Sequence, residues 1–272
     1  MNVAQIGFDL QLLSRGRFTL GLGSQIRPHI QRRYSMPWSH PAARMREFVL
    51  AVRAIWDAWD GGGPLDFRGE FYTHTLMTPV FNPGPHHYGR ARIGVGGVGP
   101  RMLEVAASVS DTVMLHPFNS RASLDELALP AVERGLRSAG RERGDIEVMA
   151  VCLIVTGATG PELDAAVAVA RSQLAFYAST PAYAPVLGCH GWEELHPRLN
   201  AMSKEGRWSE MSGLIPDDLL ESIAVVGRRD EIAAGVTARV AGVADIVSLE
   251  CTRLPDAAHF ADIVAALKSR PV

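Results

Sequence analysis

Apolar positions along the chain follow two alternating periods, one typical of helices and one typical of buried strands. Val3, Ile6, Leu10 and Leu13 recur every three or four residues, which predicts a helix that ends before Gly16. The same spacing predicts helices over residues 41–60, 100–109, 123–139, 161–177 and 256–269. Short apolar runs bounded by turn residues predict strands over residues 18–23, 91–95, 111–116, 146–156 and 244–250. Strands that alternate with helices indicate an α/β fold, with five recognisable parallel strands and outer helices.

Two stretches depart from this alternation, near residues 61–90 and 178–222. The first contains a predicted hairpin that turns at Arg68-Gly69, and the second is irregular with helical pieces. The chain shows no internal repeat and no linker that would divide it. We therefore predict a single domain over residues 1–272.

Composition narrows the class of protein. The 272 residues are 47% hydrophobic and 21% charged, which is enough to bury a core. A net charge of −2 disfavours a nucleic-acid binder, because phosphate contacts require a basic excess. No apolar run reaches the roughly 18 residues of a membrane span, and no signal-peptide pattern opens the chain. Three widely separated cysteines suggest a reducing compartment, and a cytoplasmic protein is expected.

The clearest candidate site is a glycine motif, G-x-G-x-x-G, from Gly94 to Gly99. It follows a predicted strand and precedes a helix that begins at Pro100, where backbone N–H groups favour an anion such as phosphate. A dinucleotide fold also needs an acidic residue about 20 positions on, but the next strand ends at His116 without one. We therefore interpret the motif as a phosphate cradle and disfavour NAD. A tight turn without a ligand is the alternative.

A second glycine-rich strand exit, Gly21 to Gly23, is followed by Ser24 and Gln25. The carboxyl ends of parallel strands form the binding face of α/β proteins, and two such exits suggest a flat, anionic ligand. Close strand packing is the alternative. Nearby basic side chains could neutralise an anion or simply be solvated: Arg27, His29, Arg32 and Arg33.

Other reactive side chains give weaker signals. His116 ends a predicted strand and would face the binding edge, although a hydrogen-bonded structural histidine is the commoner outcome. His86, His87 and His190 lack partners at metal-ligand spacing, and no metal site is predicted. No G-x-S-x-G motif is present, which leaves a hydrolase triad without support.

Several of these motifs together resemble the luciferase-like flavin and deazaflavin oxidoreductases. The resemblance is carried by residues 8–25, 67–72 and 96–100, with Ala106, Ala107 and Asp111 following. Further stretches resemble the actinobacterial branch that uses coenzyme F420: residues 76–79, 116–118, 175–183 and 190–192.

The resemblance implies an α/β barrel whose coenzyme lies at the carboxyl ends of the strands. It implies a role in coenzyme binding for Gly23, Ser24, Gln25, Gly96, Gly97, Val98, Gly99 and Pro100. The implied activity is hydride transfer between F420 and a small organic substrate. The alternatives are an FMN-dependent monooxygenase of the same family and a non-catalytic truncated relative that binds a ligand or partner.

The chain also departs from the family pattern. Its first strand matches the fourth of the family barrel, and three N-terminal strands have no counterpart, which predicts an incomplete barrel. Residues 18–23 and 244–250 would then be apolar edges, and we expect a homodimer or larger assembly. Some relatives carry a carboxylate after the first glycine exit, but Gln25 and Ile26 stand here, and no catalytic residue is predicted.

Overall fold

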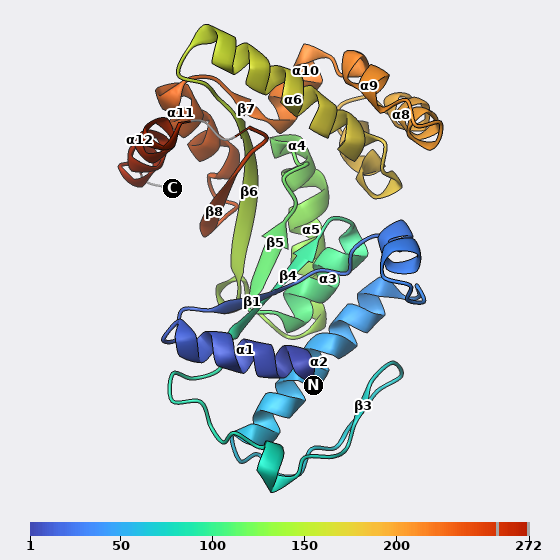
Figure 1. Cartoon of the computed structure of the whole chain (residues 1–272), viewed down its shortest axis with the longest axis vertical. Helices are drawn as coiled ribbons and strands as arrows, with labels where there is room; N and C mark the ends of the chain where they lie inside the picture. Colours follow the sequence, from blue (N-terminus) through green and yellow to red (C-terminus); the bar gives the residue numbers. More distant parts are fainter. Residues whose placement is uncertain (254–255, 271–272) are drawn as a thin grey trace. The chain divides into compact units, whose positions relative to one another are not determined.

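The computed structural model describes residues 1–253 and 256–270. The chain forms two compact units (Figure 1). Unit 1 comprises Met1–Val113 and Ala131–Ile146, and unit 2 comprises Met114–Pro130 and Glu147–Val272. None of the described helices is both long and apolar enough to span a membrane.

The strands of unit 1 are parallel, as the alternating pattern predicts. Strand β1 (Thr19–Leu22) pairs with β4 (Arg92–Gly97), and Leu20 lies opposite Ile93. Strand β5 (Thr112–Leu115) is the next neighbour of β4 and leads into unit 2. The helices associated with these strands are α1 (Asn2–Leu13), α2 (Pro41–Trp59), α3 (Pro100–Val109) and most of α5 (Leu129–Ser138).

Helix α2 forms the centre of the unit 1 core because one of its faces is entirely apolar. Val49, Ile55 and Trp59 on this face are almost completely buried. The indole of Trp56 donates a hydrogen bond to the carbonyl of Ala4 in α1 (3.1 Å). A buried indole N–H needs such a partner, and the contact therefore fixes α1 against α2.

The predicted hairpin is present, with strands β2 (Phe67–Arg68) and β3 (Thr73–His74), but its turn spans residues 69–72 because Arg68 is paired with Thr73. Its turn is held by one carboxylate of α2. Glu47 accepts hydrogen bonds from the backbone N–H groups of Glu70, Phe71 and Tyr72. Charge-assisted bonds of this kind are stronger than neutral ones, and they hold the hairpin on α2.

Unit 2 is built around β6 (Glu147–Val155), which pairs in parallel with β7 (Val225–Val226) and β8 (Ile246–Cys251). Helices α11 (Arg229–Val240) and α12 (Ala257–Lys268) pack on these strands through Ile232, Val236 and Ile263. Helix α6 (Gly160–Ala178) starts at a capping box made by Thr159 and Glu162. The shorter helices are α4 (Arg121–Ser123), α7 (Ala184–Gly188), α8 (Leu195–Lys204), α9 (Trp208–Met211) and α10 (Asp217–Ile223).

The predicted α/β class with parallel strands and outer helices is confirmed. All five predicted strands are found, with ends shifted by two residues or fewer. The sequence missed β7, because a strand of two residues is too short to show a hydrophobic period. Within the described residues β1 and β8 each pair with a single strand, consistent with the edges expected from an incomplete barrel.

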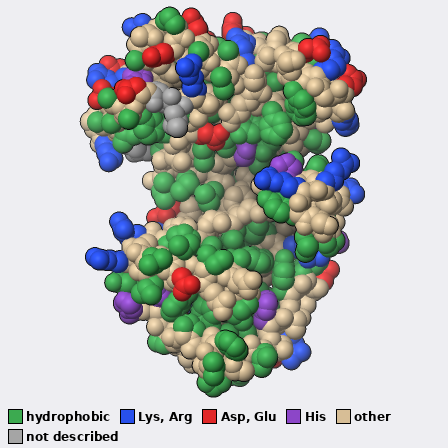
Figure 2. Space-filling model, viewed as in Figure 1, with side chains coloured by type: hydrophobic (Ala, Val, Ile, Leu, Met, Phe, Trp, Pro, Cys, Tyr) green, Lys and Arg blue, Asp and Glu red, His purple; other side chains and the backbone are tan. Residues whose placement is uncertain are grey.

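Exposed apolar side chains gather on α1, and hydrophobic atoms cover this part of unit 1 in Figure 2. Ile6 is 52% exposed, Leu12 42% and Leu13 77%. An apolar patch of this kind is typical of association surfaces. The predicted homo-oligomer stays a prediction, and α1 and the edge of β1 are the surfaces on which it would depend.

Candidate functional site

The two glycine-rich strand exits lie side by side in unit 1. The parallel register of β1 and β4 sets Gly21 opposite Gly94 and Leu22 opposite Val95. Gly23 and Gly96 therefore follow at the same carboxyl edge, and a Cβ atom on Gly96 would lie 3.6 Å from the Leu22 carbonyl oxygen. This common edge is the arrangement that the sequence predicts for a ligand held by backbone groups.

The backbone at this edge is open. Apart from the adjoining residues, no atom of the described chain lies within 4 Å of the position that a Cβ would take on Gly23 or on Gly99. Gly99 is the N-cap of α3, which begins at Pro100, and the first N–H groups of a helix lack partners within the helix. After Gly23 the chain turns sharply, because Gln25 adopts the left-handed conformation (φ 58°) that non-glycine residues rarely take. Open glycines beside a helix start suit a phosphate group.

Gly97 differs from these two glycines. It is buried, and a Cβ there would lie 2.9 Å from Cδ2 of Leu103 in α3. The residue therefore lets α3 pack closely on the end of β4. Its φ angle is not in the left-handed region. Val98 follows as a half-buried residue.

A cavity of about 400 Å³ opens beside the exit of β1. Gly23 and Ser24 line it together with apolar side chains that include Met36, Trp38 and Phe48. This volume lies in the range of small-molecule sites, which are mostly apolar with a few polar groups. The cavity can therefore hold a flat organic group next to the open backbone of Gly23.

The charged residue of this cavity is Arg44. Its Nε donates a hydrogen bond to Ser39 Oγ (2.8 Å), and its guanidinium lies 4.4 Å from the ring centre of Phe71. Both contacts hold the cation in place. Sequence reasoning missed Arg44, although it is one residue from Met45 and four from Phe48 on α2, which also line the cavity.

The basic residues suggested by the sequence are not in the lining of this cavity. Arg27 donates to Gln31, and Arg33 stacks on Tyr34 at 5.5 Å. Arg27, Arg32 and Arg33 are exposed, which favours the interpretation of a solvated basic segment.

Unit 2 has its own polar cluster at the carboxyl end of β5. His116 follows the last residue of β5, and its ring lies 4.6 Å from the ring of Tyr183 and 4.9 Å from that of Tyr177. Burial lowers the pKa of His116 to about 4 and raises the pKa of Tyr183 to about 12. His116 is therefore a neutral, hydrogen-bonded histidine near pH 7.

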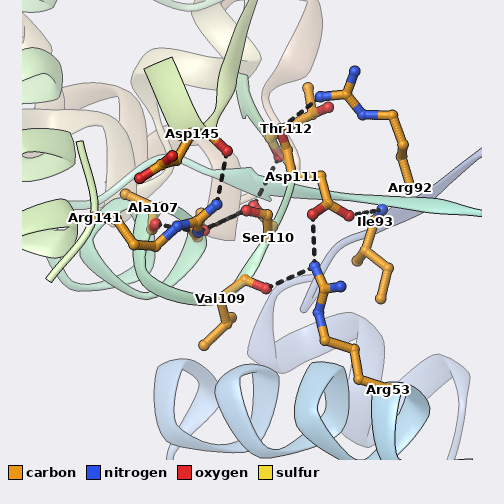
Figure 3. Close-up of polar contacts among 11 residues, drawn as sticks. Arg53, Arg92, Ile93, Ala107, Val109, Ser110, Asp111, Thr112, Arg141 and Asp145 are labelled. Carbon is orange, nitrogen blue, oxygen red and sulfur yellow. Dashed lines mark hydrogen bonds and ion pairs between the residues drawn. The ribbon is translucent and has the colours of Figure 1, made fainter. Parts of the chain in front are cut away.

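Asp111, a residue of the family motif, has a structural role. It lies just before β5, and Figure 3 shows the polar contacts around it. The glycine exits are at the other, carboxyl ends of β1 and β4. Its carboxylate accepts hydrogen bonds from Arg53 (2.8 Å) and from the backbone N–H of Ile93 (2.8 Å). Nearby, Arg141 donates to the carbonyl oxygens of Ala107 and Ser110, as Figure 3 also shows. These contacts join α2, α3 and the start of β4.

Replacing Asp111 with alanine is expected to lower the free energy of unfolding by about 2 kcal/mol, because the Ile93 N–H and Arg53 would both lose their acceptor. Urea unfolding followed by circular dichroism would measure the change. Asp9→Ala on the exposed face of α1 is the control and should stay within about 0.5 kcal/mol of wild type. Equal stability of the two variants would contradict a structural role for Asp111.

Comparison with known proteins assigns this architecture to a class of oxidoreductases. The family model of the luciferase-like monooxygenases matches residues 1–245. The chain belongs to this family. An uncharacterized protein of Mycobacterium tuberculosis is 51% identical over 247 residues, which cover 91% of this chain and 73% of that protein.

More distant relatives have named activities. The 5,10-methylenetetrahydromethanopterin reductase of Archaeoglobus fulgidus is 27% identical over 244 residues, covering 85% of this chain and 68% of that protein. The structure of the coenzyme F420 dependent tetrahydromethanopterin reductase of Methanopyrus kandleri matches with a TM-score of 0.75. That match covers 97% of this chain and 76% of the other at 19% identity, which shows a shared fold.

Proposed function

We propose that this protein is an F420-dependent oxidoreductase of the cytoplasm that transfers a hydride to or from a small organic substrate. The observation that carries the proposal is the open glycine edge shared by β1 and β4, with a cavity of about 400 Å³ beside it. Such an edge offers backbone donors to an anionic tail and an apolar space to a flat ring.

Family membership supports this proposal at the level of chemistry. Luciferase-like proteins are oxidoreductases or monooxygenases, and both named relatives are tetrahydromethanopterin reductases. The Methanopyrus kandleri enzyme depends on coenzyme F420. Together with the F420-branch motifs in the sequence, these relatives favour the deazaflavin.

The chain's own residues would bind and orient the coenzyme, which supplies the hydride chemistry when bound. Gly96, Gly97, Val98, Gly99 and Pro100 would hold a phosphate at the start of α3. Gly23, Ser24 and Gln25 would lie beside the ring and tail. The apolar cavity wall would exclude water from the ring, and Arg44 would provide a fixed positive charge.

An FMN-dependent monooxygenase is the second candidate, because the family is named for monooxygenases and FMN also has a flat ring and a phosphate. A non-catalytic relative that binds a ligand is the third. These candidates differ in the coenzyme that is bound and in whether any reaction follows.

Fluorescence titration of the purified protein with F420 and with FMN tests the proposal. We expect saturable binding of F420 in the micromolar range or tighter, with FMN at least 10-fold weaker, a difference of about 1.4 kcal/mol. Tighter binding of FMN would favour the monooxygenase. Failure to bind either coenzyme would refute the proposed function.

A further inference from the structure

One wall of the cavity in unit 1 carries a positive charge on a surface that is otherwise largely apolar. This wall is formed by the first two turns of α2, where Arg44, Met45 and Phe48 line the cavity. Among the described residues of the lining, Arg44 is the single charged side chain, and it is half-buried. The glycine edge contributes Gly23 and Ser24 to the same cavity. A group that enters the cavity therefore meets one cation.

Two contacts fix the orientation of this cation. The Nε–H of Arg44 donates a hydrogen bond to Ser39 Oγ (2.8 Å), and the guanidinium carbon lies 4.4 Å from the centre of the Phe71 ring. Phe71 is itself held in place, because its backbone N–H donates to the Glu47 carboxylate (2.7 Å). A guanidinium that is oriented in advance loses little conformational freedom when it binds a ligand.

The hydrogen bond to Ser39 also defines the edge of the guanidinium that a ligand can use. Because Nε is engaged, the two terminal nitrogens of Arg44 are the pair from which parallel N–H bonds can be donated. This fork matches the two oxygens of a carboxylate. A single cation also balances the charge of a carboxylate, whereas a phosphate dianion would keep an uncompensated charge against an apolar wall.

The segment that leads into α2, residues 24–40, has a strained backbone. Gln25, Ser35 and His40 have left-handed φ angles of 58°, 55° and 44°. Non-glycine residues rarely adopt this conformation, and those that do cluster at sites where a ligand is held. The segment supplies Ser39 and several apolar residues of the cavity lining. Its strained shape is therefore consistent with a wall that is formed for binding.

We propose that Arg44 anchors the carboxylate of an aromatic acid that enters this cavity. The assignment of this acid as the substrate rests on the proposed function. An aromatic acid suits the lining because Trp38, Phe48 and Tyr72 present their rings to the cavity. Two charge-assisted hydrogen bonds to Arg44 then orient the acid, and the apolar lining contacts its ring.

Isothermal titration calorimetry with phenylacetate and its uncharged analogue phenylacetamide tests the proposal. We expect wild type to bind the acid about 10-fold or more tightly than the amide, because the ring is the same and only the carboxylate pairs with Arg44. Arg44→Gln should remove this preference and leave the affinity for the amide within about threefold of wild type. Arg46→Gln is the matched control, since it removes the same charge from an exposed position on the same helix.

A second variant and a spectroscopic signal distinguish carboxylate recognition from a merely structural arginine. Arg44→Lys keeps the charge but cannot donate two parallel bonds from one plane, and it should bind phenylacetate about fivefold more weakly than wild type. In ¹⁵N spectra of wild type, the Nε–Hε resonance of Arg44, assigned through Arg44→Lys, should shift with phenylacetate and stay in place with phenylacetamide. Equal responses to both probes, or equal losses of affinity for both in Arg44→Gln, would overturn the inference.

The remaining outcomes separate this inference from the proposed function. Tighter binding of phenyl phosphate than of phenylacetate would overturn the choice of a carboxylate. If Arg44→Gln loses as much affinity for F420 as for phenylacetate, Arg44 belongs to the anionic tail of the coenzyme and the inference is wrong. If wild type binds F420 but does not distinguish the acid from the amide, the inference fails and the proposed function stands. If it binds phenylacetate through Arg44 but binds neither coenzyme, the proposed function fails and the carboxylate site stands.

Discussion

Replacing Gly23 with valine is expected to weaken F420 binding roughly 100-fold, a loss of about 2.7 kcal/mol, while leaving the fold stable. The position is open and its backbone is not left-handed, and a β-branched residue at the end of a strand costs little. The new side chain would instead occupy the space in which the ligand must approach the backbone. Isothermal titration calorimetry with F420, together with thermal unfolding, measures both effects.

A second glycine variant is the control for coenzyme binding, and a third tests the packing of α3 on β4. Gly144→Val is equally open and lies outside the cavity, and it should change neither affinity nor stability appreciably. Gly97→Val should lower the free energy of unfolding by about 1–3 kcal/mol, because its side chain would overlap Leu103. Wild-type affinity in a folded Gly23→Val protein would show that this edge does not contact the coenzyme.

The residues of the site differ in how far the sequence could predict them. The glycine exits of β1 and β4 were predictable because each closes an apolar run, and parallel pairing then brings them to one edge. The packing role of Gly97 was not predictable, since it depends on how close α3 lies to β4. Arg44 was hidden for a similar reason: its place in the cavity depends on the fold of residues 22–39 around α2.

The fold shows the same division. Long periodic segments such as α2 and β6 were predicted to within two residues, because their own burial pattern defines them. Strand β7 was not, because its two residues are too short to show a period, and helices α7 to α10 were expected only as helical pieces without bounds. Likewise, residues 116, 177 and 183 were visible as motifs, but their convergence on one hydrogen-bonded cluster required the structure.

Lowering the pH from 7 to 4 is expected to remove up to about 3 kcal/mol of stability through His116 alone. Burial lowers the pKa of His116 in the folded protein to about 4, whereas an unfolded histidine titrates near 6.5. Between these values the unfolded chain binds the extra proton, and protonation therefore favours unfolding. The contribution is complete above pH 6.5 and is lost as the pH falls toward 4.

Urea unfolding of wild type and His116→Phe at a series of pH values isolates this contribution. The phenylalanine variant should be less stable at pH 7, because the Phe118 N–H and Tyr183 lose their partner. The stability difference between the two proteins should shrink by about 3 kcal/mol by pH 4. If the two proteins instead lose stability in parallel over this range, the pKa of His116 is not lowered in the folded protein.

In unit 1, the hydrogen bonds of Asp111 that stabilise the fold and the residues proposed to bind the coenzyme lie at opposite ends of the strands. Arg53, Ile93 and Asp111 join helices and strands at the amino ends, whereas the glycine exits and the cavity lie at the carboxyl ends. Substitutions in residues 24–39, which line the cavity in part, therefore leave these contacts in place. Residues 24–39 can therefore change over evolutionary time without loss of the contacts that hold the fold. Divergence among relatives should accordingly be concentrated in residues 24–39, with Arg53 and Asp111, which are joined through their side chains, changing together or not at all.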